Sequence, residues 1–217
     1  MSRLRISTPR GYTIAEVLTV LVIMGFVSTF VALIIEPMFS GANSQGAKLD
    51  TLQAAERAFY RLQREIHQSN VNGFYVCTYP APTTCASPSG LLTNATVIAI
   101  ISPKTNGTGQ LKWDSSQGQP SWQGFSVYWL APNANGVMSL NYAFNDPGGA
   151  AMNPGSVNAA VDNALGASAQ TLATSVSGIQ VSQTVITSTI GLKMFATATD
   201  SNKTNESSFE SDTVTRN

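Results

Sequence analysis

Residues 11–36 have the sequence GYTIAEVLTVLVIMGFVSTFVALIIE, and this stretch decides the fold. It contains nineteen successive residues without a charged side chain, from Val17 to Ile35. At a helical rise of 1.5 Å per residue, such a segment nearly spans the ~30 Å hydrocarbon core of a bilayer. The sequence therefore predicts one transmembrane helix over residues 12–36.

The basic residues before this helix predict its orientation. Arg3, Arg5 and Arg10 precede the apolar stretch, with no acidic residue among them. Positive charges that flank a membrane helix tend to stay in the cytoplasm. We therefore expect a single-pass protein of the inner membrane whose C-terminus lies in the periplasm.

A secretory signal peptide is the alternative explanation of the same stretch. Ser40-Gly41-Ala42 has the small-x-small pattern of a cleavage site, although the apolar core is longer than the usual ~7–15 residues. Glu16 does not fit this alternative, because an ionised group in lipid costs about 2–4 kcal/mol and needs a partner. Glu16 and the preceding Gly11 favour a retained helix, and the discarded signal stays as the competing hypothesis.

The segment Gly11-Tyr12-Thr13-Ile14-Ala15-Glu16-Val17-Leu18, followed by an apolar helix, resembles the class III signal of type IV prepilins and pseudopilins. The usual pattern is Gly, Phe, Thr, Leu, Ile, Glu, and this chain keeps the glycine and the glutamate in register. The resemblance implies that a prepilin peptidase cuts after Gly11, that residues 1–11 are a basic leader, and that Tyr12 becomes N-methylated. It also implies insertion into a helical filament at an inner-membrane assembly platform, with other pilins or pseudopilins as partners through the N-terminal helix.

The same resemblance implies a role for Glu16. In a filament its carboxylate pairs with the charged amino group of a neighbouring Tyr12 and sets the axial register between subunits. Methylation of Tyr12 keeps that charge. At Gly11 the missing side chain permits close approach of a protease to the backbone, and a helix N-cap is the structural alternative.

Residues 37–72 are predicted to form an amphipathic helix that packs on a sheet. Its apolar residues recur at three- and four-residue steps: Leu49, Leu52, Ala55, Phe59, Leu62 and Ile66. Pro37 and the glycines after it predict a kink or partial melting over residues 36–46. The helix is expected to end within residues 67–72, with Gly73 as its cap.

Cys77 and Cys85 enclose a Pro-rich segment directly after this helix. In an oxidising periplasm, two cysteines so placed favour a local disulfide, and a pair of unbridged thiols is the alternative. A metal site needs further ligands, which the single histidine, His67, does not supply. We therefore expect a disulfide that staples the connection between helix and sheet.

Residues 73–217 are predicted to form a β-rich globular domain. Alternating, β-branched segments between Gly, Asn, Pro and Ser turns predict antiparallel strands at residues 96–102, 125–130, 139–144, 179–187, 189–197 and 209–215. Residues 145–169 are expected to be a loop with at most a short helix. The predicted fold class is α+β, with a long N-terminal helix on an antiparallel sheet. Residues 59–66, 172–179 and 213–217 resemble large minor pilins and J-type minor pseudopilins, which implies a type IV pilin-like fold.

The charge pattern does not favour nucleic-acid binding. The chain has twelve Lys+Arg and twelve Asp+Glu, and loss of the leader with its three arginines leaves nine against twelve. The remaining basic residues are scattered, and the group Arg57, Arg61 and Arg64 lies beside Glu56 and Glu65 on a helix. A basic face for nucleic acid is therefore not expected.

No catalytic constellation is found in the sequence, so we do not expect an enzyme or a cofactor. The chain lacks a Gly-rich phosphate loop and a nucleophile elbow. Asp114, Asp146, Asp162 and Asp200 lack the spacing of a calcium loop, and only a carbonyl-assisted site stays open. No metal site is predicted.

The aromatic residues of the β-rich region have two interpretations. Trp113, Trp122 and Trp129, with Tyr128 and Tyr142, can form a sugar-stacking surface or pack within the core and between strands. Packing is the expected use.

Two classes of function follow. The first is a structural subunit, a minor pilin of a type IV pilus or related filament, with a minor pseudopilin of a type II secretion system as the alternative within that class. The second is a membrane-tethered or secreted domain that binds glycan or protein through its tryptophan-bearing loops. The processing of the N-terminus distinguishes the two classes.

Overall fold

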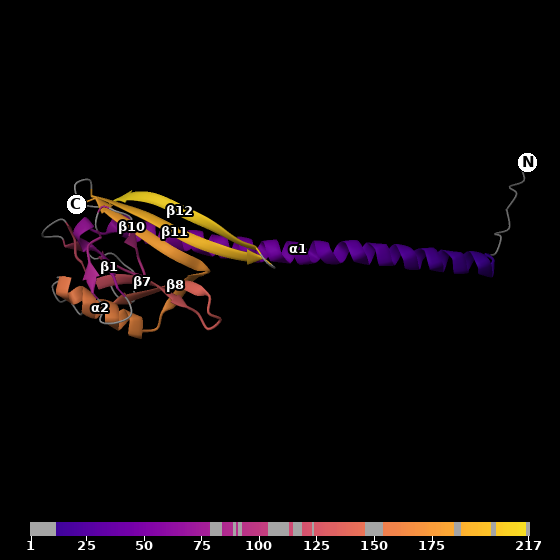
Figure 1. Cartoon of the computed structure of the whole chain (residues 1–217), viewed down its shortest axis with the longest axis horizontal. Helices are drawn as coiled ribbons and strands as arrows, with labels where there is room; N and C mark the ends of the chain where they lie inside the picture. The colour runs from indigo at the N-terminus through magenta and orange to yellow at the C-terminus, as the bar shows by residue number, and fades with distance from the viewer. Residues whose placement is uncertain are drawn as a thin grey trace, which may run out of the picture. The chain divides into compact units, whose positions relative to one another are not determined.

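The computed structural model describes most of the chain, which divides into two compact units. One unit is Met1–Ala47 and the other is Lys48–Asn217. Helix α1, Ile14–Gln68, contributes residues to both units (Figure 1). The described residues are 12–78, 84–88, 90, 93–103, 113–114, 119–122, 124–145, 154–184, 188–200 and 203–215.

A kink or partial melting was predicted over residues 36–46. All residues from Glu36 to Gly46 are helical, so partial melting is wrong and the kink stays a prediction. Pro37 removes one backbone donor from the helix, and the hydrogen bonds of the flanking residues carry the cooperative helix past it. The helix ends at Gln68, inside the predicted range, and a 3₁₀ turn, Val71–Gly73, follows.

A six-stranded antiparallel sheet has the order β2-β1-β4-β7-β8-β9 among the described residues. Its strands are β1 Phe74–Cys77, β2 Cys85–Ala86, β4 Val97–Ser102, β7 Gly124–Pro132, β8 Met138–Asn145 and β9 Gln170–Thr174. Strand β4 is buried on both faces. This explains why it is a continuous apolar run rather than an alternating one.

A four-stranded antiparallel sheet has the order β12-β11-β10-β3. Its strands are β3 Thr93–Asn94, β10 Val176–Thr184, β11 Thr189–Asp200 and β12 Lys203–Val214. Ser175, which has a positive φ of 61°, joins β9 of one sheet to β10 of the other. A separate pair consists of β5 Trp113–Asp114 and β6 Gln119–Pro120.

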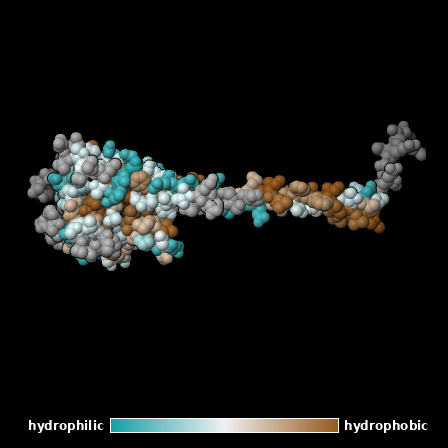
Figure 2. All heavy atoms as spheres, viewed as in Figure 1, coloured by the Kyte–Doolittle hydropathy of each residue, from teal (hydrophilic) through white to brown (hydrophobic). Residues whose placement is uncertain are grey.

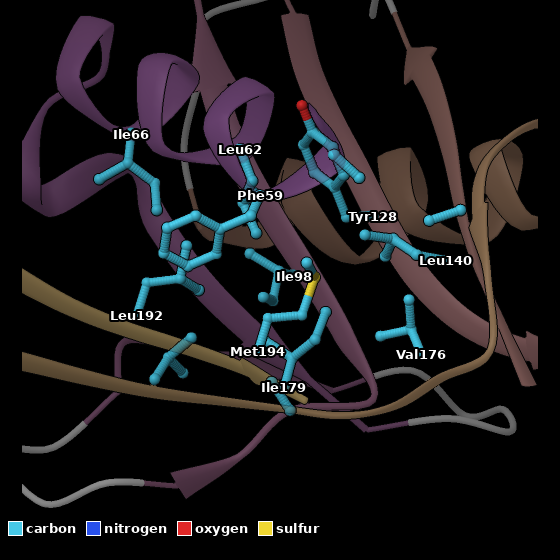
Figure 3. Packing of buried hydrophobic residues seen from close by; sticks show 14 of the residues in the cluster. Phe59, Leu62, Ile66, Ile98, Tyr128, Leu140, Val176, Ile179, Leu192 and Met194 are labelled. Atoms are coloured by element: carbon cyan, nitrogen blue, oxygen red, sulfur yellow. The ribbon is translucent and has the colours of Figure 1, made fainter. Parts of the chain in front are cut away.

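The main core forms where the second half of α1 packs against one face of each sheet (Figure 3). Phe59, Leu62 and Ile66 are at most 4% exposed. They contact residues of both sheets, including Ile98, Tyr128, Leu140, Ile179, Leu192 and Met194. Each such buried side chain contributes roughly 1.5–3 kcal/mol. The predicted packing of the amphipathic helix on antiparallel strands is confirmed, and the chain is α+β.

Leu49 departs from the predicted apolar stripe. Its side chain is 58% exposed, whereas Leu52 is partly buried against the core. The contact with the sheets therefore begins near Leu52. Periodicity alone identified the correct helix face but not where along it the packing starts.

Helix α2, Pro154–Gly166, covers the opposite face of the six-stranded sheet. Its Val157, Ala160, Val161 and Ala164 pack in a second core with residues of β4 and β7. The sequence predicted at most a short helix within residues 145–169, and α2 has thirteen residues. Small side chains let this helix lie close to the sheet although they suggested a loop.

The six predicted strands are all present, most with shifted ends, and residues 185–187 of the strand predicted at 179–187 lie outside the described residues. They correspond to β4, β7, β8, β10, β11 and β12. The short strands β1, β2, β3, β5, β6 and β9 were not predicted, because they are brief and are defined by their partners rather than by an internal pattern. Gly73 is not the helix cap. It approaches Ile101 so closely that a Cβ atom has no room there.

The expected disulfide is present, but it joins strands β1 and β2 within the six-stranded sheet and does not staple the connection between α1 and the sheet. Cys77 and Cys85 face each other in the β1–β2 pair, with 4.0 Å between their Cα atoms, and are bonded to each other. Asn158 of α2 accepts a hydrogen bond from the backbone N–H of Cys85 at 3.1 Å. The disulfide and α2 together fix the short edge strand β2.

The described aromatic residues named in the prediction for the β-rich region pack mostly inward. Tyr128 is fully buried, Trp129 is 6% exposed, and Trp122 packs against the second core. Tyr142 lies at 5.1 Å from Tyr128, centroid to centroid. These positions agree with the packing interpretation of the aromatic residues, and the side chain of Trp113 lies outside the described part.

Candidate functional site

The strongest candidate site is the first turn of α1, at the start of the apolar segment. Tyr12 and Thr13 precede the helix and Ile14 begins it. The side chain of Tyr12 is 87% exposed, and that of Glu16 is also exposed. Gly11, the predicted cleavage position, lies outside the described residues.

Thr13 and Glu16 form a capping box. Glu16 Oε2 accepts from the backbone N–H of Thr13 at 2.9 Å and from Thr13 Oγ1 at 3.0 Å. The backbone N–H of Glu16 lies 3.3 Å from Thr13 Oγ1. This arrangement satisfies backbone donors that a helix start otherwise leaves unpaired. The capping box was not predicted, although the Thr-x-x-Glu spacing is its sequence signature.

The capping box stabilises the negative charge of Glu16 within its own chain. A carboxylate at a helix N-terminus lies at the positive end of the helix dipole. No Lys or Arg of the described residues pairs with Glu16. Local hydrogen bonds therefore hold the carboxylate in place and leave it available for a cation from another molecule.

The helix behind this turn is apolar on every side. Residues Ile14–Glu36 have a mean hydropathy of 2.7, and none of this segment is buried within the protein. Figure 2 shows the hydrophobic surface along it. This is the one helix of the described residues that is long and apolar enough to cross a membrane. Ser40-Gly41-Ala42, the alternative cleavage site, lies in the helical part of the chain beyond it.

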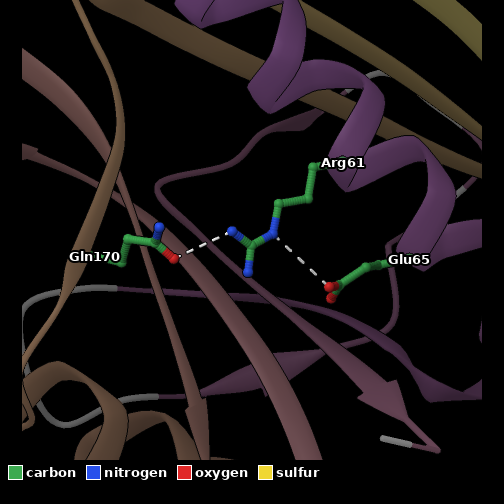
Figure 4. A network of polar contacts seen from close by, with 3 residues as sticks. All are labelled: Arg61, Glu65 and Gln170. Atoms are coloured by element: carbon green, nitrogen blue, oxygen red, sulfur yellow. Dashed lines mark hydrogen bonds and ion pairs between the residues drawn. The ribbon is translucent and has the colours of Figure 1, made fainter. Parts of the chain in front are cut away.

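A partly buried polar cluster fixes α1 on the six-stranded sheet (Figure 4). Arg61 Nη1 donates to Gln170 Oε1 at 3.2 Å, and Arg61 Nε lies 4.0 Å from Glu65 Oε1. The guanidinium carbon is 3.9 Å from the ring centroid of Tyr142. Glu65, which lies outside the predicted apolar stripe, is only 3% exposed.

The cluster shifts the ionisation of the nearby tyrosines. Burial raises the pKa of Tyr128 well above its usual value, and the negative charge of Glu65 raises it further. The pKa of Tyr142 is also raised, first by burial and then by Glu65. Both phenols therefore favour the neutral form, and the effect is larger for the more deeply buried Tyr128. The cluster joins helix α1 to strand β9 of the six-stranded sheet.

Metal ligation finds no support in the described geometry. Within the described ranges, no three His, Cys, Asp or Glu side chains gather as a metal-binding group. Asp146, one of the aspartates considered from the sequence, lies outside the described residues.

Comparison of the chain with models of protein families, with curated proteins and with solved structures finds no match. The geometry of the described residues and the pattern of the N-terminal sequence therefore carry the functional assignment.

Proposed function

We propose that the chain is a structural subunit of a membrane-assembled filament, a minor pilin of a type IV pilus or related filament. One observation carries the proposal. An ionisable residue, Glu16, stands at the fifth position after Gly11 at the head of an otherwise apolar membrane-length helix. Charged groups at such depth are expensive and are retained for function.

The capping box supports this proposal. Before assembly, Thr13 supplies hydrogen bonds to the Glu16 carboxylate, so the group is partly satisfied within its own chain. After cleavage at Gly11, Tyr12 has a free, positively charged amino group. In a filament, the amino group of a neighbouring Tyr12 is the cation that Glu16 lacks among the described residues of its own chain.

The rest of α1 suits the same function. The apolar first half offers a surface for neighbouring helices within the membrane and then within the filament. The second half is part of the core of the globular unit. A helix with one half for assembly and the other inside the domain resembles the pilin-like layout.

The proposed location follows from the same segment. Three arginines before the helix favour a cytoplasmic N-terminus and a periplasmic globular unit. The Cys77–Cys85 disulfide suits an oxidising compartment. Prepilin peptidase and the assembly platform are the proposed partners, and the proposal includes no catalytic step.

The mass of the mature N-terminus tests this function. The full chain is expressed with a pilus assembly system, and its N-terminal peptide is measured by mass spectrometry. Loss of residues 1–11 with an added methyl group on Tyr12 is the expected result. Loss of residues 1–42, or no loss, contradicts it. Gly11→Val is the matched control, because its side chain blocks the protease and leaves the precursor uncut.

A further inference from the structure

Two arginines on the outer face of α1 have no carboxylate partner among the described residues. Arg57 and Arg64, with Tyr60 and Arg61, line a shallow hollow of about 350 Å³. Arg57 Nη2 is held 3.3 Å from Gln53 Oε1, whereas Arg64 is exposed and makes no ion pair within the described part of the chain. Arg64 is therefore the freer of the two cations.

A hollow of opposite charge lies between the four-stranded sheet and strands β7 and β8 of the six-stranded sheet. It has a volume of about 450 Å³ and contains Glu206 of β12. The Glu206 carboxylate is held by Ser177, whose Oγ donates to Oε1 at 3.1 Å. Apolar side chains form the walls, namely Leu130, Met138, Ile179 and Phe195. A carboxylate among apolar walls matches an arginine, whose long stem is apolar and whose head is charged.

Arg64 and Glu206 of one copy lie on opposite sides of the four-stranded sheet. Phe209 and Ser211 of β12 face α1, since their partners are Phe59 at 5.9 Å between centroids and Gln63 at 2.8 Å. Side chains alternate along a strand, so Glu206 faces away from the helix. The two surfaces are therefore complementary but cannot meet within one molecule.

We propose that Arg64 of one copy of this chain enters the Glu206 hollow of a second copy. The arginine stem lies against Met138 and Phe195, and the guanidinium pairs with the Glu206 carboxylate. Two different surfaces of the same chain make this contact, so it is head-to-tail and does not close a symmetric dimer. The inference rests on the proposed filament function and specifies which faces of the globular units touch.

Cross-linking in membranes tests the contact with the full chain. Arg64→Cys and Glu206→Cys variants with tags of different size are co-expressed and mildly oxidised. Because each copy carries one new cysteine, a mixed disulfide reports contact between copies only. We expect the mixed product to exceed, several-fold, that of Glu206→Cys with Asn163→Cys, an exposed position on α2. Equal yields from both pairs overturn the proposal.

A charge swap provides the second measurement. Arg64→Glu and Glu206→Arg are each expected to reduce self-association of the full chain, measured by co-purification of two tagged copies. The variant with both changes is expected to regain it, because the pair is restored with reversed charge. A double variant no better than either single variant overturns the proposal. Protease resistance of the globular unit checks that all variants are folded.

The measurements distinguish a failure of the proposed contact from a failure of the proposed function. The N-terminal mass is measured on the same samples. Correct loss of residues 1–11 without the Arg64–Glu206 cross-link overturns the contact and leaves the filament function standing. A specific cross-link in a chain that is never cut after Gly11 supports the contact and overturns the function as proposed.

Discussion

Thr13 and Glu16 are hydrogen-bonded to each other across the first turn of α1, with 3.0 Å between Thr13 Oγ1 and Glu16 Oε2. The carboxylate has a second bond from the backbone N–H of Thr13. Glu16, which was predicted to pair with another subunit, therefore already accepts hydrogen bonds within its own chain. Local capping and assembly pairing are compatible, because a carboxylate has two oxygens and accepts several hydrogen bonds.

Glu16→Gln separates these two roles. Glutamine keeps a side-chain oxygen that can accept from Thr13, but it has no charge for the Tyr12 amino group. We expect normal cleavage after Gly11 and a several-fold loss of incorporation, measured as the ratio of subunit in sheared filaments to subunit in membranes. Thr19→Val is the control, because it removes only a hydroxyl bonded to Ala15 O at 2.8 Å. Incorporation of the Gln variant at the wild-type level contradicts the charge pair.

Leu62→Ala tests the packing of α1 on the two sheets. Leu62 is fully buried, so the substitution is expected to lower the free energy of unfolding by about 2–5 kcal/mol. Urea unfolding of the detergent-solubilised chain, followed by tryptophan fluorescence, measures the change. Leu49→Ala, the same substitution at an exposed site of the same helix, is expected to stay within about 0.5 kcal/mol. Similar losses for both variants are inconsistent with the described packing.

Cys77→Ala combined with Cys85→Ala tests the disulfide. The cysteines are separated by eight positions, and closing a loop of this size restricts the unfolded chain by about 2–3 kcal/mol. We expect the double variant to lose that stability in the same urea assay. The wild-type chain under reducing conditions is the control and should behave alike. Alkylation of both thiols in the unreduced wild-type chain rules the disulfide out.

Ionisation of the buried Tyr128 is expected to limit the stability of the folded protein at alkaline pH. Its pKa is raised in the folded state by burial, so the folded protein favours the protonated phenol. The stability that depends on the protonated phenol is fully present below the unfolded pKa of about 10. It is lost as the pH rises from there through the folded pKa. Tyr128→Phe is therefore expected to unfold at a higher pH than the wild type. Circular dichroism during alkaline titration measures the midpoint.

Tyr60→Phe is the matched control for this titration. Tyr60 is 58% exposed, and the same hydroxyl is lost there. We expect its alkaline midpoint to equal that of the wild type. If the two variants shift the midpoint equally, burial of Tyr128 is not what limits stability at high pH.

Much of the secondary structure follows from local pattern. The apolar helix, the six longer strands and the disulfide were predicted, because each has a signal within a few successive residues. The length of helix α2 was underestimated. The helix is stabilised by packing on the six-stranded sheet, and its Ala, Asn and Gly composition does not indicate that contact. The short strand β9 depends on its partner β8 in the same way.

Residues 11–36 alone determined the membrane-length helix and the placement of Glu16 relative to Gly11, since length, hydropathy and spacing are properties of the linear chain. Only the tertiary structure decided that Glu65 is buried beside Arg61, and that Arg64 and Glu206 lie on opposite sides of one sheet. The physical reason is that burial and facing depend on which elements pack together. Those contacts join residues more than a hundred positions apart, such as Arg61 and Gln170.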